Sequence, residues 1–431
     1  MRILIQPGSS SCRNVGDVAM LQIAVRRLES LWPNSSIEVI TRAPDLLKVH
    51  CPNVRPLPDG VFNYWLEGRF LLSGICRRFS NYLATKLAPL ERKAWLRWPG
   101  ITQHGVRWKY RLRGNALSDP GNFLDHLKQA DLVVVSGMGG LNDSFKDSAL
   151  CFLDLLEAAV RRRIPTAALG QGIGPVEDPE LWERMQTVLP QVNLITLREG
   201  LAGLPLLNKL GVPHSRILVT GDDSIELAFE RRPLNLGRGL GINLRLATYA
   251  QLDSDTMSRI RDVLLHVARE LKVPIIPVII SQNPADSDAT TFRSLLEGLE
   301  SFWSGELEPA YTAQVIDQIG LCRLVVTGSY HGAVFALSQG IPAICLARSA
   351  YYMDKFRGLQ DQFGTGCKLY LLDGTMNPHE LSETILSHWS SADQFRDGLL
   401  SAAQQQIEKS KSAYRYLGEL THTHGSPVVC A

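Results

Sequence analysis

Short apolar runs alternate with amphipathic stretches along most of this chain. The runs that we interpret as strands are residues 3–5, 37–40, 132–135, 166–169, 194–196, 217–219, 241–244, 274–280, 324–326 and 343–346. Helical spacing of apolar residues separates them, at 17–31, 149–161, 181–189, 200–210, 254–271, 290–302 and 313–319. Repeated alternation of strand and helix predicts parallel sheets covered by helices on both faces. We therefore predict a protein of the α/β class.

The alternation is interrupted twice, and the interruptions divide the chain. We predict an N-terminal Rossmann-like domain at 1–228, which carries an insertion at about 58–128. A Pro- and Gly-containing linker follows, and a second Rossmann-like domain extends over 239–378. Residues 379–431 form C-terminal helices and a tail. Two parallel-sheet domains joined by a linker predict a cleft between them, with the ligand at the carboxyl ends of the strands.

The composition is that of an ordinary globular protein, with 431 residues of which 45% are hydrophobic and 20% charged. No apolar run approaches the roughly 18 residues of a membrane span, and the N-terminus does not read as a secretory signal. The eight cysteines are scattered without a C-x-x-C pair, and the ten histidines form no metal-binding pattern. We therefore expect a cytoplasmic protein with reduced thiols and no metal site.

The positive charge is concentrated in the insertion. Residues 61–115 hold eleven Lys and Arg against two Glu, whereas the net charge of the whole chain is only +2. Four of the eight tryptophans lie in the same segment. One interpretation is a solvated helical subdomain with a small aromatic core. The other is a surface that meets the inner face of a membrane, because Trp, Lys and Arg on amphipathic helices favour anionic headgroups. No nucleic-acid-binding motif accompanies the patch.

Three glycine-bearing loops follow predicted strands in the first half, at 8–17, 136–143 and 170–175. Glycine permits tight turns and a close approach of backbone to a ligand. Plain strand–helix turns would also explain each loop taken singly. All three together would line one edge of the sheet, where a ligand is expected.

The second half holds a sharper signal. The strand at 324–326 runs into Gly-Ser-Tyr-His-Gly and then into a helix of small residues. The free backbone N–H groups of a helix start favour an anion. An imidazole placed there can donate a proton, although His331 could equally be a satisfied structural histidine. Arg245 follows another strand, and its guanidinium suits a carboxylate or phosphate. Lys355 also follows a strand and could point into the same site. The alternative for both is an ordinary surface residue.

Two acidic pairs, Glu177-Asp178 and Asp222-Asp223, could hold a metal or mark helix starts. Asp178 precedes a proline and Asp223 precedes a helical run. We favour the second interpretation, because acidic residues are common in the first turn of a helix.

The chain resembles the polysaccharide pyruvyl transferase family over about residues 1–364, apart from the insertion. The resemblance rests on a series of short motifs that occur in the family's order. They are Asn14-Val15-Gly16-Asp17, residues 136–140, residues 170–175, Leu197-Arg198-Glu199, Gly221-Asp222, Asn243-Leu244-Arg245, Ser329-Tyr330-His331, Gly340-Ile341-Pro342, and Tyr352 with Lys355. The resemblance implies a fold like that of glycosyltransferase type B enzymes. It also implies pyruvyl transfer from phosphoenolpyruvate to sugar hydroxyls, which forms a ketal. The chain departs from the family pattern at Ser329, where an Arg is usual, and at Asp222-Asp223, where Asp-Pro is usual.

The resemblance also implies roles for individual residues. His331 would be the general acid or a donor to phosphate, and Arg245 would hold the donor's carboxylate or phosphate. The other donor-binding residues would be Ser329, Tyr330, Gly332 and Lys355. The acceptor, a glycan or lipid-linked sugar, would meet Asn14, Gly16, Asp17, Gly139, Gly140, Asn142 and Gln171. No step requires a metal or a cofactor. The alternatives are a transferase that uses a nucleotide sugar on the same scaffold, and a non-catalytic glycan-binding relative.

Overall fold

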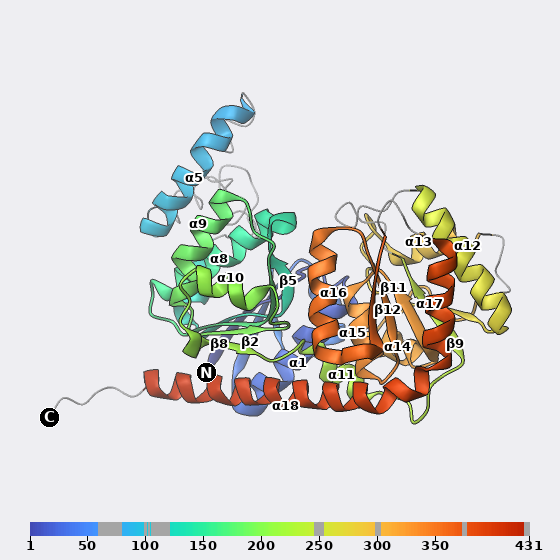
Figure 1. Cartoon of the computed structure of the whole chain (residues 1–431). Helices are drawn as coiled ribbons and strands as arrows, with labels where there is room; N and C mark the ends of the chain where they lie inside the picture. Colours follow the sequence, from blue (N-terminus) through green and yellow to red (C-terminus); the bar gives the residue numbers. More distant parts are fainter. Residues whose placement is uncertain are drawn as a thin grey trace.

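Two α/β domains lie side by side, each built on a parallel sheet (Figure 1). The structure, a computed structural model, describes residues 1–58, 80–98, 101, 104, 121–244, 254–297, 303–372 and 377–425. This arrangement confirms the predicted class of two Rossmann-like domains. Most of the basic insertion lies outside the described residues, as do residues 298–302 of the helix expected at 290–302. That helix ends at Leu295.

The sheet of the N-terminal domain has the strand order β3-β2-β1-β4-β6-β7-β8, with β5 paired to β6. Its strands are β1 (Arg2–Gln6), β2 (Ser36–Thr41), β3 (Arg55–Pro58), β4 (Leu132–Val135), β5 (Met138–Leu141), β6 (Thr166–Ile173), β7 (Leu194–Leu197) and β8 (Ile217–Val219). The helices of this half are α1 (Val15–Leu31), α2 (Pro44–His50), α5 (Asn81–Arg97), α7 (Gly121–Gln129), α8 (Lys146–Val160), α9 (Pro179–Val188), α10 (Gly203–Lys209) and α11 (Ser224–Glu230).

The second sheet has the order β10-β9-β11-β12-β13, and all its pairs are parallel. Its strands are β9 (Gly239–Asn243), β10 (Ile275–Pro277), β11 (Cys322–Thr327), β12 (Ala343–Ala347) and β13 (Cys367–Leu371). The helices are α12 (Ser254–Leu271), α13 (Asp288–Leu295), α14 (Thr312–Ile319), α15 (Tyr330–Ser338), α16 (Ala350–Phe363), α17 (Pro378–Ser390) and α18 (Ala392–Gly425).

Continuous apolar runs form the central strands because both faces of each sheet are covered. In β1, Leu4 belongs to the core on one face of the sheet, whereas Ile3 and Ile5 belong to the core on the other. In β11, Val325 faces one core and Val326 the other. Successive side chains of a strand point to opposite faces, so an uninterrupted apolar run is what a fully covered sheet requires.

Two of the expected glycine loops contain strand instead. The loop expected at 136–143 contains β5, and the one expected at 170–175 begins inside β6. Gly170 has φ +61° and the pairing register shifts between Ala168 and Gln171. Glycine tolerates this conformation without strain, so β6 bends and continues where the sequence suggested that it stops.

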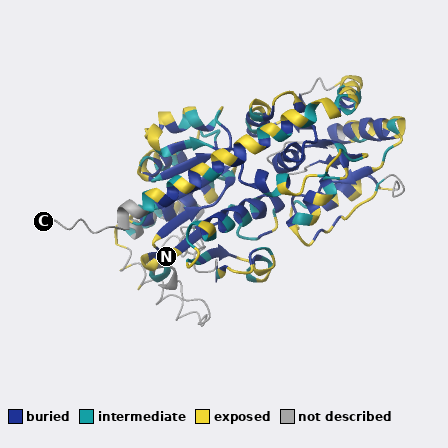
Figure 2. Cartoon of the chain, turned by 90° about the horizontal axis from the view of Figure 1, so that it is seen from below, coloured by how far each residue is buried: buried dark blue, intermediate teal, exposed yellow. Residues whose placement is uncertain are grey.

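Helix α18 crosses from the C-terminal domain to the N-terminal one (Figure 1). Its buried residues recur every three or four positions, and its opposite face is exposed (Figure 2). Leu399, Ala403 and Ile407 pack into the core of the C-terminal domain, while Tyr414 and Leu417 pack into that of the N-terminal domain. The last helix therefore joins the two domains along one side.

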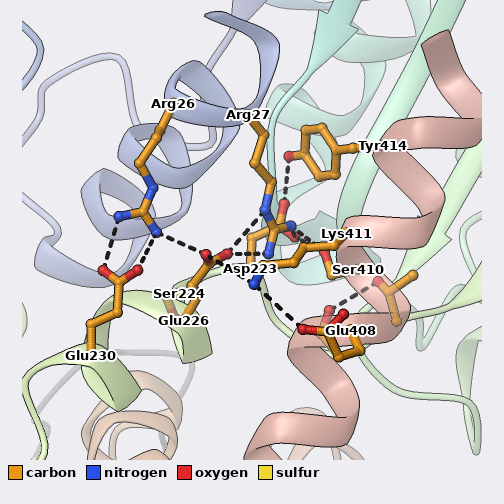
Figure 3. A network of polar contacts seen from close by, with 12 residues as sticks. Arg26, Arg27, Asp223, Ser224, Glu226, Glu230, Glu408, Ser410, Lys411 and Tyr414 are labelled. Carbon is orange, nitrogen blue, oxygen red and sulfur yellow. Dashed lines mark hydrogen bonds and ion pairs between the residues drawn. The ribbon is translucent and has the colours of Figure 1, made fainter. Parts of the chain in front are cut away.

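A buried polar cluster fixes this helix to both domains. Arg27 of α1 forms an ion pair with Asp223 at 3.1 Å and a second one with Glu226 of α11. From α18, Ser410 and Tyr414 donate hydrogen bonds to the two carboxylate oxygens of Asp223, at 2.5 and 2.8 Å (Figure 3). We call these five residues the clamp cluster. Their hydrogen bonds and ion pairs link α1, α11 and α18.

Candidate active site

A pocket of about 130 Å³ lies where the two domains meet. Eight residues expected from the sequence line it: Asn14, Asp17, Gly139, Gly140, Ser329, Tyr330, His331 and Lys355. Backbone hydrogen bonds close one side, because Val15 donates to Ile280 at 2.9 Å and Gln282 donates to Arg13 at 2.8 Å. The start of α1 is thus bonded directly to the chain that follows β10 in the other domain.

His331 lies in the first turn of α15 and is only 6% exposed. Its ring packs on α1, where a Cβ built on Gly16 would lie 2.0 Å from the imidazole. Gly16 therefore makes room for the histidine and does not line the pocket. Gly332 likewise faces inward, since a Cβ there would lie 2.7 Å from Thr327 Oγ1.

A carboxylate accompanies the imidazole. His331 Nε2 lies 3.5 Å from Asp222 Oδ2, and Arg198 Nη1 lies 3.9 Å from the same oxygen. Burial by itself would raise the pKa of the Asp222 carboxyl, but His331 and Arg198 outweigh it, so that the pKa is lowered. The other oxygen, Oδ1, accepts a hydrogen bond from the backbone N–H of Ser224 at 2.9 Å.

The interpretation of the acidic pairs as helix starts is therefore incomplete. Asp178 does cap α9, accepting a hydrogen bond from Leu181 N at 2.9 Å. Asp222 supports the start of α11 with one oxygen and faces His331 with the other. Asp223, the next residue, points away into the clamp cluster.

Asp17 is the second carboxylate of the pocket and comes from the N-terminal domain. Asn14 caps α1 through its side-chain oxygen, which accepts from Gly16 N and Asp17 N at 3.0 and 3.2 Å. This cap holds Asp17 in the first turn of the helix. Desolvation raises the pKa of the Asp17 carboxyl, against the opposing pull of His331, Arg198 and Lys355. The two carboxylates of the pocket thus have pKa values displaced in opposite directions.

Arg198 is the main cation of the pocket and is 1% exposed. Its guanidinium lies 4.0 Å from the centre of the Tyr330 ring. Within the described residues, Nε and Nη2 have no hydrogen-bond partner. Gly139 and Gly172 leave space for these atoms, since a Cβ on either would lie within 2.5 Å of the guanidinium. The space for this arginine thus depends on two of the glycine-bearing segments.

Lys355 approaches the same place from the C-terminal domain. Its Nζ lies 3.5 Å from the centre of the Tyr351 ring, next to the hydroxyl of that tyrosine. Tyr351 in turn donates to the backbone oxygen of Gly139 at 2.9 Å. A Cβ on Gly139 would lie 2.4 Å from Nζ. Two cations from different domains therefore converge on one glycine.

Besides Gly16 and Gly332, two expected residues do not line the pocket. Gln171 is fully buried and donates to the backbone oxygens of Val135 and Leu169, because it lies within β6. Asn142 is buried and donates to Gly139 O at 2.7 Å, which holds that segment in place. Arg245 lies outside the described residues.

Sequence reasoning gave no site role to several residues that the structure brings to the site, among them Arg198, Asp222, Tyr351 and Tyr352. A usable signal existed for two of them. Arg198 directly follows β7, and Asp222 follows β8 by three residues, so both leave the same edge of one sheet. A charged residue just after an apolar strand indicates that the edge of the sheet where that strand ends is polar.

The described parts of the chain contain neither a candidate metal-binding group nor a candidate membrane-spanning helix. No group of three or more His, Cys, Asp and Glu side chains there could hold a metal ion. None of the helices in those parts combines the length and the apolar character needed to cross a bilayer.

Solved structures share this fold at low sequence identity. UDP-GlcNAc 2-epimerase from Neisseria meningitidis, bound to UDP-GlcNAc, has a TM-score of 0.58 and 12% identity, covering 98% of this chain and 100% of that one. UDP-GlcNAc 2-epimerase from Methanocaldococcus jannaschii, in complex with UDP-GlcNAc and UDP, has a TM-score of 0.55 and 14% identity. The match covers 98% of this chain and 100% of that one. A glycosyltransferase from Rickettsia africae has a TM-score of 0.53 and 10% identity, with 99% of each chain covered. These similarities show the glycosyltransferase type B fold.

Sequence comparison identifies the family. No curated protein sequence matches the chain. The family model described as polysaccharide pyruvyl transferase matches residues 14–350, which include pocket-lining residues of both domains, from Asn14 to His331. Because this match covers most of the chain, the protein belongs to the polysaccharide pyruvyl transferase family.

Proposed function

We propose that this protein transfers the pyruvyl group of phosphoenolpyruvate to two hydroxyls of one sugar in a polysaccharide or lipid-linked glycan precursor. The observation that carries the proposal is a small polar pocket that brings together one imidazole, two carboxylates and two cations. The family supports transferase chemistry, and the pocket has the charges that this donor and this reaction need.

Phosphoenolpyruvate carries a phosphate and a carboxylate, so its site needs buried positive charge. Arg198 offers two unpartnered N–H groups, and Lys355 lies across Gly139 from it. The helix start after Ser329 adds backbone N–H groups, which also favour an anion. Arg198, supplied by the other domain, compensates in this scheme for the arginine that Ser329 replaces.

His331 is the general acid of the proposed reaction. As imidazolium, it donates its proton to the methylene carbon of the donor, which becomes a methyl group and leaves the neighbouring carbon electrophilic. Asp222 stabilises the imidazolium from 3.5 Å. The first sugar hydroxyl then attacks the electrophilic carbon and forms a C–O bond.

Asp17 is the proposed base, because it lines the same pocket as His331 and comes from the other domain. It takes the proton of the attacking hydroxyl, and a carboxylate whose pKa is raised is a stronger base than a solvated one. The second hydroxyl attacks the same carbon, and the C–O bond to phosphate breaks. One hydroxyl proton finally resides on the methyl group and the other on phosphate, so atoms and charge balance. Arg198 and Lys355 stabilise the departing phosphate.

The test combines ligand binding with product analysis. Phosphoenolpyruvate should raise the melting temperature of the protein, and a soluble glycan acceptor should gain the methyl signal of a pyruvate ketal in NMR spectra. His331→Ala should stay folded and form no ketal. Stabilisation by a nucleotide sugar alone would instead identify a glycosyltransferase, and an active His331→Ala protein would remove the proposed acid.

A further inference from the structure

Helix α5 is a part of the molecule that the proposed chemistry does not use. It projects from the N-terminal domain, on the side of the molecule opposite to α18 (Figure 1). Several of its described large apolar side chains are exposed, among them Tyr82 at 71% and Leu90 at 63%. Leu83 and Trp98, at the two ends of the helix, are more than half exposed as well. Clustered exposure of this kind marks an interaction surface.

The exposed residues share one face of the helix. Tyr82, Lys86, Leu90, Lys93 and Arg97 follow one another at intervals of three or four residues, and all five are exposed. Residues at this spacing lie above one another on a helix surface. The face therefore mixes apolar and basic side chains along its whole length, whereas a solvated helix would show mainly polar ones.

Charge identifies the partner of this face. The sequence of α5 contains four basic residues and a single acidic one, Glu91. Lys and Arg can place their apolar stems along a hydrocarbon boundary while their charges reach the headgroups. Trp and Tyr prefer the same boundary, since each combines an apolar ring with a polar group. An anionic lipid surface complements every one of these features.

We propose that α5 docks this protein on an anionic lipid bilayer, with Leu83, Leu90 and Trp98 in the interface and Lys86, Lys93 and Arg97 against the headgroups. The helix lies on the membrane and does not cross it. Binding then combines burial of apolar side chains with electrostatic attraction between the basic residues and the anionic headgroups, which salt weakens.

The docking helix contacts an element that lines the pocket. Helix α5 packs against α8, and α8 supplies Ser148 and Phe152 to the pocket lining. A membrane-bound α5 would therefore hold the pocket near the lipid surface, where a lipid-linked sugar presents its hydroxyls. This second step rests on the proposed function, whereas the docking itself does not.

The test is co-sedimentation of the full chain with vesicles that contain phosphatidylglycerol, compared with vesicles of phosphatidylcholine only, at low and high salt. We expect binding to the anionic vesicles at low salt and its loss at high salt. Leu83→Ser/Leu90→Ser and Lys86→Glu/Lys93→Glu should each weaken binding by roughly tenfold or more. The matched controls are Leu234→Ser and Lys209→Glu, exposed residues far from α5 in the sequence, which should bind as the wild type does.

Two results would overturn the proposal: no binding to anionic vesicles at low salt, or binding that the α5 variants leave unchanged. If the protein binds DNA or RNA in preference to the vesicles, this face of α5 is a nucleic-acid-binding surface, and the membrane proposal is rejected as well. The α5 variants should keep the wild-type melting temperature and full ketal formation on a soluble acceptor. Failure of the pyruvyl transfer itself would leave vesicle binding unaffected, so the two proposals fail separately.

Discussion

Two buried polar clusters of this protein are built from the same two elements and behave in opposite ways. Helix α1 contributes Asp17 to the pocket and Arg27 to the clamp cluster. The chain after β8 contributes Asp222 to the first and its neighbour Asp223 to the second. One turn of backbone thus sends consecutive carboxylates into two different environments.

The clusters differ in whether their hydrogen bonds are complete. In the clamp cluster the charged atoms have partners, since Arg27 contacts two carboxylates and both oxygens of Asp223 accept hydrogen bonds. In the pocket, Arg198 Nε and Nη2 and His331 Nε2 have none among the described residues. An unpartnered buried polar group costs stability. We infer that the clamp cluster maintains the fold, and that the pocket keeps its unpaired atoms for a ligand.

The largest expected effect is on catalysis at His331. His331→Ala should lower ketal formation by roughly a thousandfold or more, because the proton donor is lost. The melting temperature should fall only modestly, because Asp222 loses the imidazole but keeps Arg198 and the backbone N–H of Ser224 as partners. His388→Ala, a half-buried histidine on α17, is the control and should remain fully active. If His331→Ala retains its activity, the contrast between a functional pocket and a structural clamp cluster is wrong.

A substitution in the clamp cluster should lower the stability of the fold and leave substrate binding unchanged. Arg27→Met should lower the free energy of unfolding by about 3–5 kcal/mol, because it leaves Asp223 and Glu226 buried without their counter-charge. The Michaelis constant for phosphoenolpyruvate should stay near the wild-type value in the folded fraction. Chemical denaturation and steady-state kinetics measure the two quantities separately. A changed Michaelis constant without loss of stability would contradict a purely structural role.

Arg198 is the matching arginine of the pocket. Arg198→Lys should raise the Michaelis constant for phosphoenolpyruvate by roughly ten- to a hundredfold, since lysine cannot reproduce two directed N–H groups. The stability should fall by less than in Arg27→Met, because lysine keeps a positive charge beside Asp222 and Nε and Nη2 have no hydrogen-bond partner among the described residues. If Arg198→Lys destabilises the fold as strongly as Arg27→Met does, the two clusters serve the same purpose.

The smallest expected effect separates the two carboxylates of the pocket. The pKa of Asp17 is raised, so its ionised form destabilises the folded state at neutral pH, and Asp17→Asn should raise the melting temperature there. This gain should vanish as the pH falls below the unfolded pKa near 4. Asp17→Asn should nevertheless lower ketal formation, because the proposed base is lost.

Asp222 should show the reverse dependence. Its pKa is lowered, so its charge stabilises the fold above the unfolded pKa, and this contribution is lost as the pH falls through the folded pKa. Asp222→Asn should therefore lower the melting temperature at pH 7 and have no effect in strong acid. Melting curves from pH 3 to pH 7.5 test both variants. The same sign for Asp17→Asn and Asp222→Asn at pH 7 would contradict the opposite pKa directions.

The elements with the clearest periodicity were predicted almost to the residue. The helix expected at 254–271 is α12 (Ser254–Leu271), and the helix expected at 313–319 is α14 (Thr312–Ile319). Prediction failed where glycines interrupt the pattern, because a bent strand at Gly170 resembles a turn in one dimension. Asn14, Asp17 and His331 were found as site residues because loops at strand ends concentrate polar side chains.

By itself, the sequence determined the alternation of strand and helix, the covered sheets and the histidine at the start of α15. These follow from local spacing and from the burial of apolar residues on both faces of a sheet. Only the tertiary structure decided that Arg198 reaches Tyr330 across the domain boundary, and that Asp222 and Asp223 serve different clusters. Such pairings depend on how two domains pack against each other, and no local pattern in the chain records that packing.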